Sequence, residues 1–155
     1  MGRVAVEDAY AAGLLHDLGM VLLLRADPEG YETLVAESGD YDTLAEAERA
    51  RFGFDHGDAT AAVALHWNLP EVLVAAVGAV HRLERVAEEG SAPRRLAACI
   101  TLADGLCAER GLSPLALPPG WDGSEALALL ESDLDLETLR QVAGESLSQE
   151  EGVPI

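Results

Sequence analysis

Two residues that could belong to a catalytic or metal-binding site stand side by side in the most apolar part of the sequence. His16 and Asp17 interrupt the apolar stretch 9–24. Neighbouring positions on an α-helix point about 100° apart, so both side chains can face one point only near a kink or a helix end. Gly19 follows closely and could provide such a kink. Taken alone, His16 is either a core histidine with a satisfied hydrogen bond or part of a site.

The other histidines and one aspartate each leave two interpretations. His56 is either a polar residue of a helical first turn or a ligand, whereas we expect His66 at the surface or in packing contacts. His81 either hydrogen-bonds a neighbouring carboxylate or binds a metal. Asp104 lies in an apolar segment, and a buried carboxylate needs a partner. His16 or an arginine would provide that partner without any metal.

The charge of the chain limits the chemistry further. Ten basic residues stand against 28 acidic ones, for a formal net charge of −18 at pH 7. A surface this acidic repels nucleic-acid backbones and anionic lipids, which argues against roles at either. All ten basic residues are arginine, which excludes a Schiff-base lysine and a P-loop lysine. No Ser-His-Asp or Cys-His pattern is recognisable, and we expect Glu46 and Glu48 on a solvated helix face.

Helix signals dominate the elements that must position these residues. The chain has 155 residues, 49% of them hydrophobic, which is enough for one domain with a buried core. Asp55 is a candidate N-cap, and the residues from Thr43 to Glu46 form a capping-box pattern. The sequence therefore predicts an all-α fold, a compact bundle of about eight helices. The expected helices are 6–26, 29–37, 43–52, 56–68, 70–88, 93–110, 124–131 and 135–148.

Targeting and cysteine signals indicate a cytoplasmic protein. The stretch 9–24 is short for a membrane span and carries a charge in its middle. Glu7 and Asp8 precede it instead of basic residues, which argues against a signal peptide. Cys99 and Cys107 are eight residues apart on one expected helix, about 12 Å along its axis, so they cannot form a disulfide there. We expect both to be reduced.

The order of the motifs resembles a known family. The segment Gly13-Leu-Leu-His-Asp-Leu-Gly19 resembles the signature of the HD superfamily of metal-dependent phosphohydrolases. The run Glu48…Gly53-Phe-Asp-His56, then His66-Trp67-Asn-Leu-Pro70, then Ala76…His81 resembles the HDOD family more closely. The resemblance covers roughly 9–107. It implies a helical bundle of the HD-domain type that serves as an output module of bacterial signalling proteins.

The resemblance also implies a candidate ligand set. His16 and Asp17 match the central pair that binds metal in HD enzymes, and Asp104 matches the late aspartate that closes the site. His56 and His81 resemble positions from which two-metal relatives recruit further histidines. This set of nitrogen and oxygen ligands suits Mn, Fe, Zn or Mg. The five residues are therefore metal ligands or the vestige of a metal site.

Two departures argue against catalysis. HD enzymes take a further histidine from upstream, and none of the fifteen residues before His16 is a histidine. Two-metal relatives carry a Gly-Lys pair, where this chain has Gly19-Met20. We therefore expect a non-catalytic regulatory module without a cofactor, acting through contact with another protein or domain. The alternative is a metal-dependent phosphohydrolase acting on a nucleotide or a cyclic dinucleotide.

The family pattern further predicts how the chain is divided and assembled. HDOD domains carry an N-terminal helical subdomain, so this chain resembles the C-terminal half of one. The apolar faces of 9–24 or 69–83 would then need cover, and we expect a homodimer or a protein partner to supply it. The expected division is an HDOD-like helical core at 1–112, a proline-rich loop at 113–121, a helical cap at 122–149 and a tail at 150–155.

Overall fold

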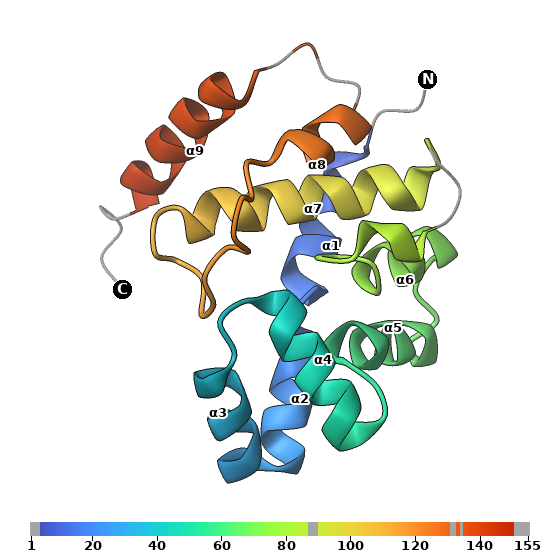
Figure 1. Cartoon of the computed structure of the whole chain (residues 1–155). Helices are drawn as coiled ribbons and strands as arrows, with labels where there is room; N and C mark the ends of the chain where they lie inside the picture. Colours follow the sequence, from blue (N-terminus) through green and yellow to red (C-terminus); the bar gives the residue numbers. More distant parts are fainter. Residues whose placement is uncertain (1–3, 87–89, 131–132, 134, 151–155) are drawn as a thin grey trace.

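The computed structural model describes residues 4–86, 90–130, 133 and 135–150. Within these ranges the chain is helical and has no β-strand (Figure 1), which confirms the all-α prediction. The described residues form nine α-helices and one short 3₁₀ helix, η1: α1 (Val6–Leu15), α2 (Leu18–Ala26), α3 (Pro28–Glu37), α4 (Tyr41–Phe52), α5 (His56–His66), α6 (Glu71–Val77), η1 (Leu83–Arg85), α7 (Ala92–Ala108), α8 (Ser124–Leu129) and α9 (Leu136–Glu150).

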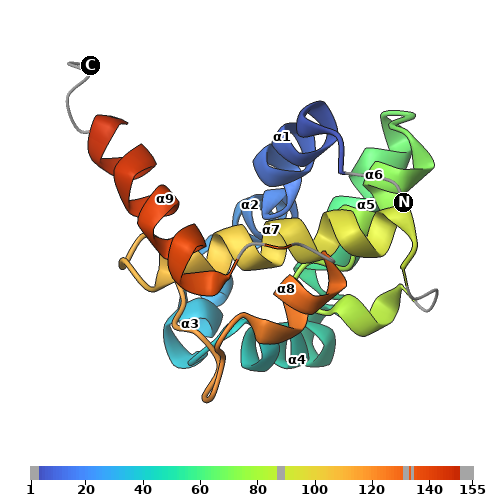
Figure 2. The same ribbon diagram turned by 90° about the horizontal axis from the view of Figure 1, so that it is seen from above.

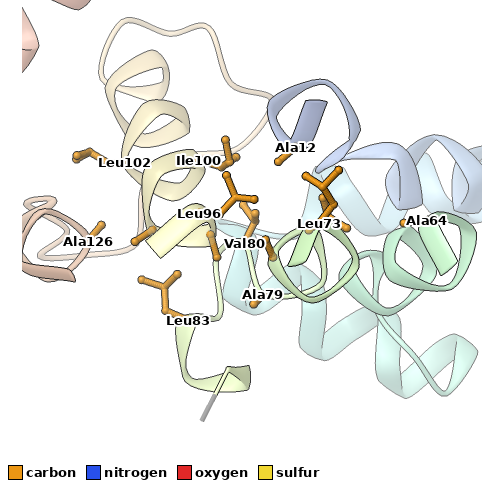
Figure 3. Close-up of a cluster of buried hydrophobic side chains, with 14 of the residues drawn as sticks. Ala12, Ala64, Leu73, Ala79, Val80, Leu83, Leu96, Ile100, Leu102 and Ala126 are labelled. Atoms are coloured by element: carbon orange, nitrogen blue, oxygen red, sulfur yellow. The ribbon is translucent and has the colours of Figure 1, made fainter. Parts of the chain in front are cut away.

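Helix α7 runs through the middle of the main core. Figure 2 shows α1 on one side of it and α8 on the other, and α6 also packs against it. Leu96 and Ile100 of α7 point toward Leu73 of α6, whereas Leu102 points to the other side of α7 (Figure 3). A second, smaller cluster of buried side chains holds the start of α4 against the segment 113–121: Tyr41, Leu44 and Leu115.

The expected single helix 6–26 is divided in two at His16 and Asp17. The break precedes Gly19, so the bend does not lie at the glycine. Gly19 serves a close contact instead: a Cβ built there would lie 1.9 Å from the backbone oxygen of His56. Its backbone N–H donates to Thr60 Oγ1 at 2.9 Å. Glycine thus lets α2 lie directly on the first turn of α5, and this contact sets where the His-Asp pair stands.

The expected long helix 70–88 is wrong. Helix α6 ends at Val77, and the chain then turns through His81, which has a positive φ of 68°. Contacts with other elements replace helical hydrogen bonds here, because the His81 N–H donates to Thr101 Oγ1 at 3.3 Å. Arg85 in η1 also donates to the Gly78 carbonyl at 3.0 Å. The last part of the expected helix, at 87–88, lies outside the described residues.

Aspartate side chains cap the starts of α3, α4 and α5. Asp55 caps α5 as predicted, in a capping box with Asp58. Helix α4 begins at Tyr41, earlier than predicted, because Asp40 is its N-cap. The Asp40 side chain accepts from the Thr43 N–H, and the Thr43 hydroxyl oxygen accepts from the Asp40 N–H. Thr43 is therefore part of a capping box that starts before it.

The last third of the chain covers one face of the core. Leu115 is buried against α4, and Tyr41 Oη lies 3.3 Å from Ser113 Oγ, so the proline-rich segment is fixed to that helix. Helix α8 then packs on α7, and α9 follows (Figure 1). Helix α9 continues to Glu150, and the rest of the expected tail, 151–155, lies outside the described residues.

One stretch, Val6–Ala26, is long and apolar enough to cross a membrane by length and composition. Its most apolar window has a mean hydropathy of 1.3 and is 17% buried. Core helices of globular proteins pass the same test. The stretch is broken at its centre, and its two halves pack against α7 and α5.

Candidate functional site

The break between α1 and α2 places two polar side chains at one point inside the bundle. His16 and Asp17 come from the break itself, His81 from the turn after α6, and Asp104 from α7. His16 Nε2 lies 3.3 Å from Asp17 Oδ2 and 3.9 Å from Asp104 Oδ1. His81 Nε2 lies 3.9 Å from Asp17 Oδ1, and its Nδ1 lies 3.9 Å from Asp104 Oδ2. We call these four residues the His-Asp cluster.

Each histidine ring is held by a contact on its far side. His16 Nδ1 lies 2.8 Å from the Gly13 carbonyl oxygen. A carbonyl oxygen only accepts, so Nδ1 carries a proton and Nε2 faces the cluster. The ring of His81 stacks on Tyr41, with centroids 3.8 Å apart and planes 8° from parallel. Both rings are therefore oriented before any ligand binds.

Several atoms of the cluster lack hydrogen bonds although they are buried. Among the described residues, His16 Nε2, Asp17 Oδ1 and His81 Nε2 are buried without a partner in hydrogen-bonding geometry. One ligand atom from each of these three residues lies within 4.8 Å of the others. Buried polar groups are ordinarily satisfied by protein, water or an ion. The cluster therefore has the unpaired polar atoms that bind a water molecule or a small ion.

The pKa values of the cluster follow from burial and mutual attraction. Burial alone would lower the pKa of His16, but the Asp17 carboxylate beside it raises that pKa above its usual value. Burial alone would raise the pKa of Asp17, yet the adjacent His16 and His81 rings hold the pKa of its carboxyl well below the usual range. Burial raises the pKa of Asp104. Asp17 is thus the carboxylate that stays ionised, and Asp104 the one that takes up a proton more easily.

His56 belongs to a separate network. Its Nδ1 lies 2.7 Å from Glu48 Oε2, and its backbone N–H donates to the same oxygen at 2.8 Å. Tyr31 donates its hydroxyl to Glu48 Oε1 at 2.5 Å. Glu48 is 0% exposed, so the expectation of a solvated face is wrong for this residue. Glu48 holds Nδ1 of His56, and among the described residues His56 is not one of the three whose ligand atoms lie within 4.8 Å of one another.

A buried ion triad was not expected from the sequence. Asp55 is 1% exposed and pairs with both Arg49 and Arg85. Burial alone would raise the pKa of Asp55, but backbone hydrogen bonding and the two arginines lower it. Arg85 also fixes the turn that carries His81, through the Gly78 carbonyl. The capping role of Asp55 was visible in the sequence, whereas its arginine partners lie on other elements.

Among the described residues, His81 of the His-Asp cluster lines three cavities, and the smallest of them, about 10 Å³, is also lined by His56, Arg82 and Arg85. The other two adjoin the cluster on the side of α8. A small one of about 50 Å³ lies between His81, Asp104 and the side chain of Trp121. A larger cleft of about 500 Å³ shares His81 and Trp121 with it and runs between η1, α7 and α8. Among the described residues that line either space, none is lysine or arginine. His66 is exposed at the end of α5 and lines neither of them.

The bundle and its His-Asp cluster define a helical module related to the HD phosphohydrolases. The family model of the HDOD domain matches residues 1–83, so the chain belongs to the HDOD family, a group of HD-related modules associated with signalling. The match includes His16, Asp17 and His81, whereas Asp104 follows it. Searches of curated proteins and of solved structures found no match.

Proposed function

We propose that the chain is a non-catalytic regulatory module that acts in the bacterial cytoplasm through contact with another protein or domain. The observation that carries this proposal is the acidic approach to the His-Asp cluster. Asp42, Glu84, Asp122 and Glu125 line the adjoining cleft without a basic residue among the lining. Transfer or hydrolysis of a phosphate requires cations around the developing negative charge. The carboxylates of the cleft create a negative potential instead, which repels the phosphates of a nucleotide.

The two arginines that follow His81 do not supply a free cation for a phosphate. Arg82 pairs with Glu84 at 3.0 Å, and Arg85 is held by Asp55. Their charges are therefore already balanced by carboxylates of the protein itself. A phosphate entering the cleft would have to break one of these pairs to gain a cation.

An apolar stripe on α1 supports the contact role. Val6, Tyr10 and Leu14 recur every four residues and are 79%, 70% and 67% exposed. Residues four apart lie on one helix face, so the three form a continuous ridge. We assign this ridge to a second copy of the chain. Two such ridges are self-complementary when related by a two-fold axis. The net charge of −18 is screened beyond about 8–10 Å at physiological salt. Burial of the apolar ridges therefore outweighs the charge repulsion once two copies are in contact.

Light scattering after size exclusion at physiological salt tests the assignment. The expected mass is twice the 16.3 kDa of the chain. Leu14→Glu should reduce it to the monomer without lowering the melting temperature, because the side chain is exposed. Val142→Glu on α9 is the matched control, since Val142 is also an exposed aliphatic residue but lies outside the ridge. A parent protein at 16.3 kDa, or a dimer that survives Leu14→Glu, would contradict the assignment.

The buried atoms of the His-Asp cluster that lack hydrogen-bond partners favour a second candidate function, a metal-dependent phosphohydrolase. His16, Asp17 and His81 would hold a divalent ion, with Asp104 as a fourth ligand, a donor set that suits Mn, Fe or Zn. Such an ion supplies an activated water and a Lewis acid. In this function His81 and His16 keep their ring orientation through Tyr41 and Gly13. Metal analysis of protein purified without chelator, with His16→Ala beside it, tests for the ion. Near-stoichiometric metal lost in the variant would favour this candidate.

A further inference from the structure

Helix α2 begins without the side-chain cap that α3, α4 and α5 have. Asp27, Asp40 and Asp55 precede those three helices, and each carboxylate accepts a hydrogen bond from a backbone N–H of the first turn. Asp17 stands at the same position before α2, yet its side chain makes no such bond. The first N–H groups of α2 therefore depend on a different partner.

Thr60 of α5 provides that partner where the two helices meet. The Gly19 N–H lies in the first turn of α2 and donates to Thr60 Oγ1 at 2.9 Å. The Thr60 hydroxyl donates in turn to the His56 carbonyl at 2.9 Å, within α5, which leaves a lone pair to accept from Gly19. Gly19 is buried and Thr60 is 1% exposed, so bulk water does not compete for this bond.

The conformation of Asp17 also differs from that of a capping residue. A capping residue is normally extended, as Asp40 is with ψ 177°, whereas Asp17 has φ −98° and ψ 9°. Its carboxylate lies with the histidines instead, since Oδ2 is 3.3 Å from His16 Nε2 and Oδ1 is 3.9 Å from His81 Nε2. The side chain of Asp17 therefore serves the His-Asp cluster and not the start of α2.

Thr60 contacts the chain on both sides of Asp17. Besides accepting from Gly19, its Oγ1 lies 3.2 Å from the His16 carbonyl oxygen. From these contacts we propose that Thr60 is a positioning residue of the His-Asp cluster: it caps α2 in place of Asp17 and leaves the Asp17 carboxylate to His16 and His81. This role is the same whether the cluster holds a divalent ion or only fixes the packing of the helices.

Crystal structures of Thr60 variants test the proposal directly. Thr60→Val keeps the shape of the side chain but removes the hydroxyl, so the buried Gly19 N–H loses its acceptor. The Asp17 carboxylate should then turn from His16 to the Gly19 N–H, to a distance of about 3 Å. Thr60→Ser keeps the hydroxyl and should leave Asp17 beside His16. Thr33→Val is the matched control, because Thr33 makes the same bond to the carbonyl four residues earlier but is exposed on α3. A carboxylate that stays beside His16 in Thr60→Val, or that leaves it in Thr60→Ser or Thr33→Val, would overturn the proposal.

Amide hydrogen exchange tests the same cap without changing Thr60. Asp17→Ala removes the carboxylate, but the Thr60 hydroxyl still accepts from the Gly19 N–H. The ratio of the Gly19 and Leu23 protection factors should stay within about twofold of the parent value, because both amides belong to α2 and share its opening. Adding Thr60→Val to Asp17→Ala removes both acceptors and should lower the ratio by about tenfold. A larger fall than twofold in Asp17→Ala alone would show that the carboxylate caps α2 and would overturn the proposal.

Discussion

Replacing Gly19 by alanine should destabilise the fold by forcing α2 away from α5. The new Cβ would lie 1.9, 2.7 and 2.9 Å from the backbone O, C and Cα of His56. These atoms are backbone, so no rotamer change can make room. Ordinary contact begins at 3.4 Å, which requires the two helices to separate by about 1.5 Å (3.4 minus 1.9). Overpacking of this kind costs about 3 kcal/mol, the upper end of the usual range.

The net effect on stability includes the helix propensity of the new residue. Alanine favours a helix over glycine by about 1 kcal/mol, so we expect a net loss of about 2 kcal/mol. In a domain of this size that loss lowers the melting temperature by about 4–8 °C. Thermal unfolding followed by far-ultraviolet circular dichroism measures it, and urea titration gives the free energy independently.

Gly13→Ala is the matched control for this experiment. Gly13 is also helical, but a Cβ there would lie 3.8 Å from Ile100 Cδ1, which is an ordinary contact. Only the propensity term remains, so Gly13→Ala should raise the stability by about 0.5–1 kcal/mol. If Gly19→Ala were as stable as Gly13→Ala, the close contact between α2 and α5 would be refuted. The account of how that contact positions His16 and Asp17 would be refuted with it.

Three further predictions concern the charges of Asp55 and Asp17. Asp55→Ala leaves Arg49 and Arg85 without their shared partner and should reduce the free energy of unfolding, measured in urea, by about 3 kcal/mol. The lowered pKa of Asp55 means that its ionised form stabilises the fold above the unfolded pKa of about 4, and this stability is lost as the pH falls through the folded pKa. Melting temperatures measured over the acid range should therefore fall more steeply for the parent than for Asp55→Asn, and parallel curves would contradict the role of Asp55. Asp17→Ala leaves two cluster histidines without their carboxylate and should cost about 1–3 kcal/mol, whereas an unchanged melting temperature would show that Asp17 does not support the fold.

The parts that local patterns specify could be predicted from the sequence. Capping by Asp55 and the helix expected at 29–37 depend on local residues; Asp55 caps α5 as expected, and the helix spans Pro28–Glu37. The meeting of His16, Asp17 and Asp104 was also expected, because a family pattern carries information on which helices pack together. The requirement for a kink at adjacent His and Asp followed from helix geometry alone.

Residues whose role depends on distant partners could not be predicted. Glu48 has the local pattern of a solvated acidic residue, and only Tyr31 and His56 explain its burial. Arg85 lies in a segment with helical propensity, yet its bonds to Asp55 and Gly78 hold a turn there instead. Long-range contacts of this kind override local preference, and a single sequence does not show them.

The most direct test of the regulatory proposal is an assay of phosphate release. Phosphomonoesters, nucleotides and cyclic dinucleotides would be supplied with Mn²⁺ to the parent protein and to His16→Ala at the same concentration. The acidic cleft and its lack of a free cation predict that the two proteins release phosphate at the same background rate. Release that depends on Mn²⁺ and disappears in His16→Ala would contradict the account and identify the His-Asp cluster as an active site.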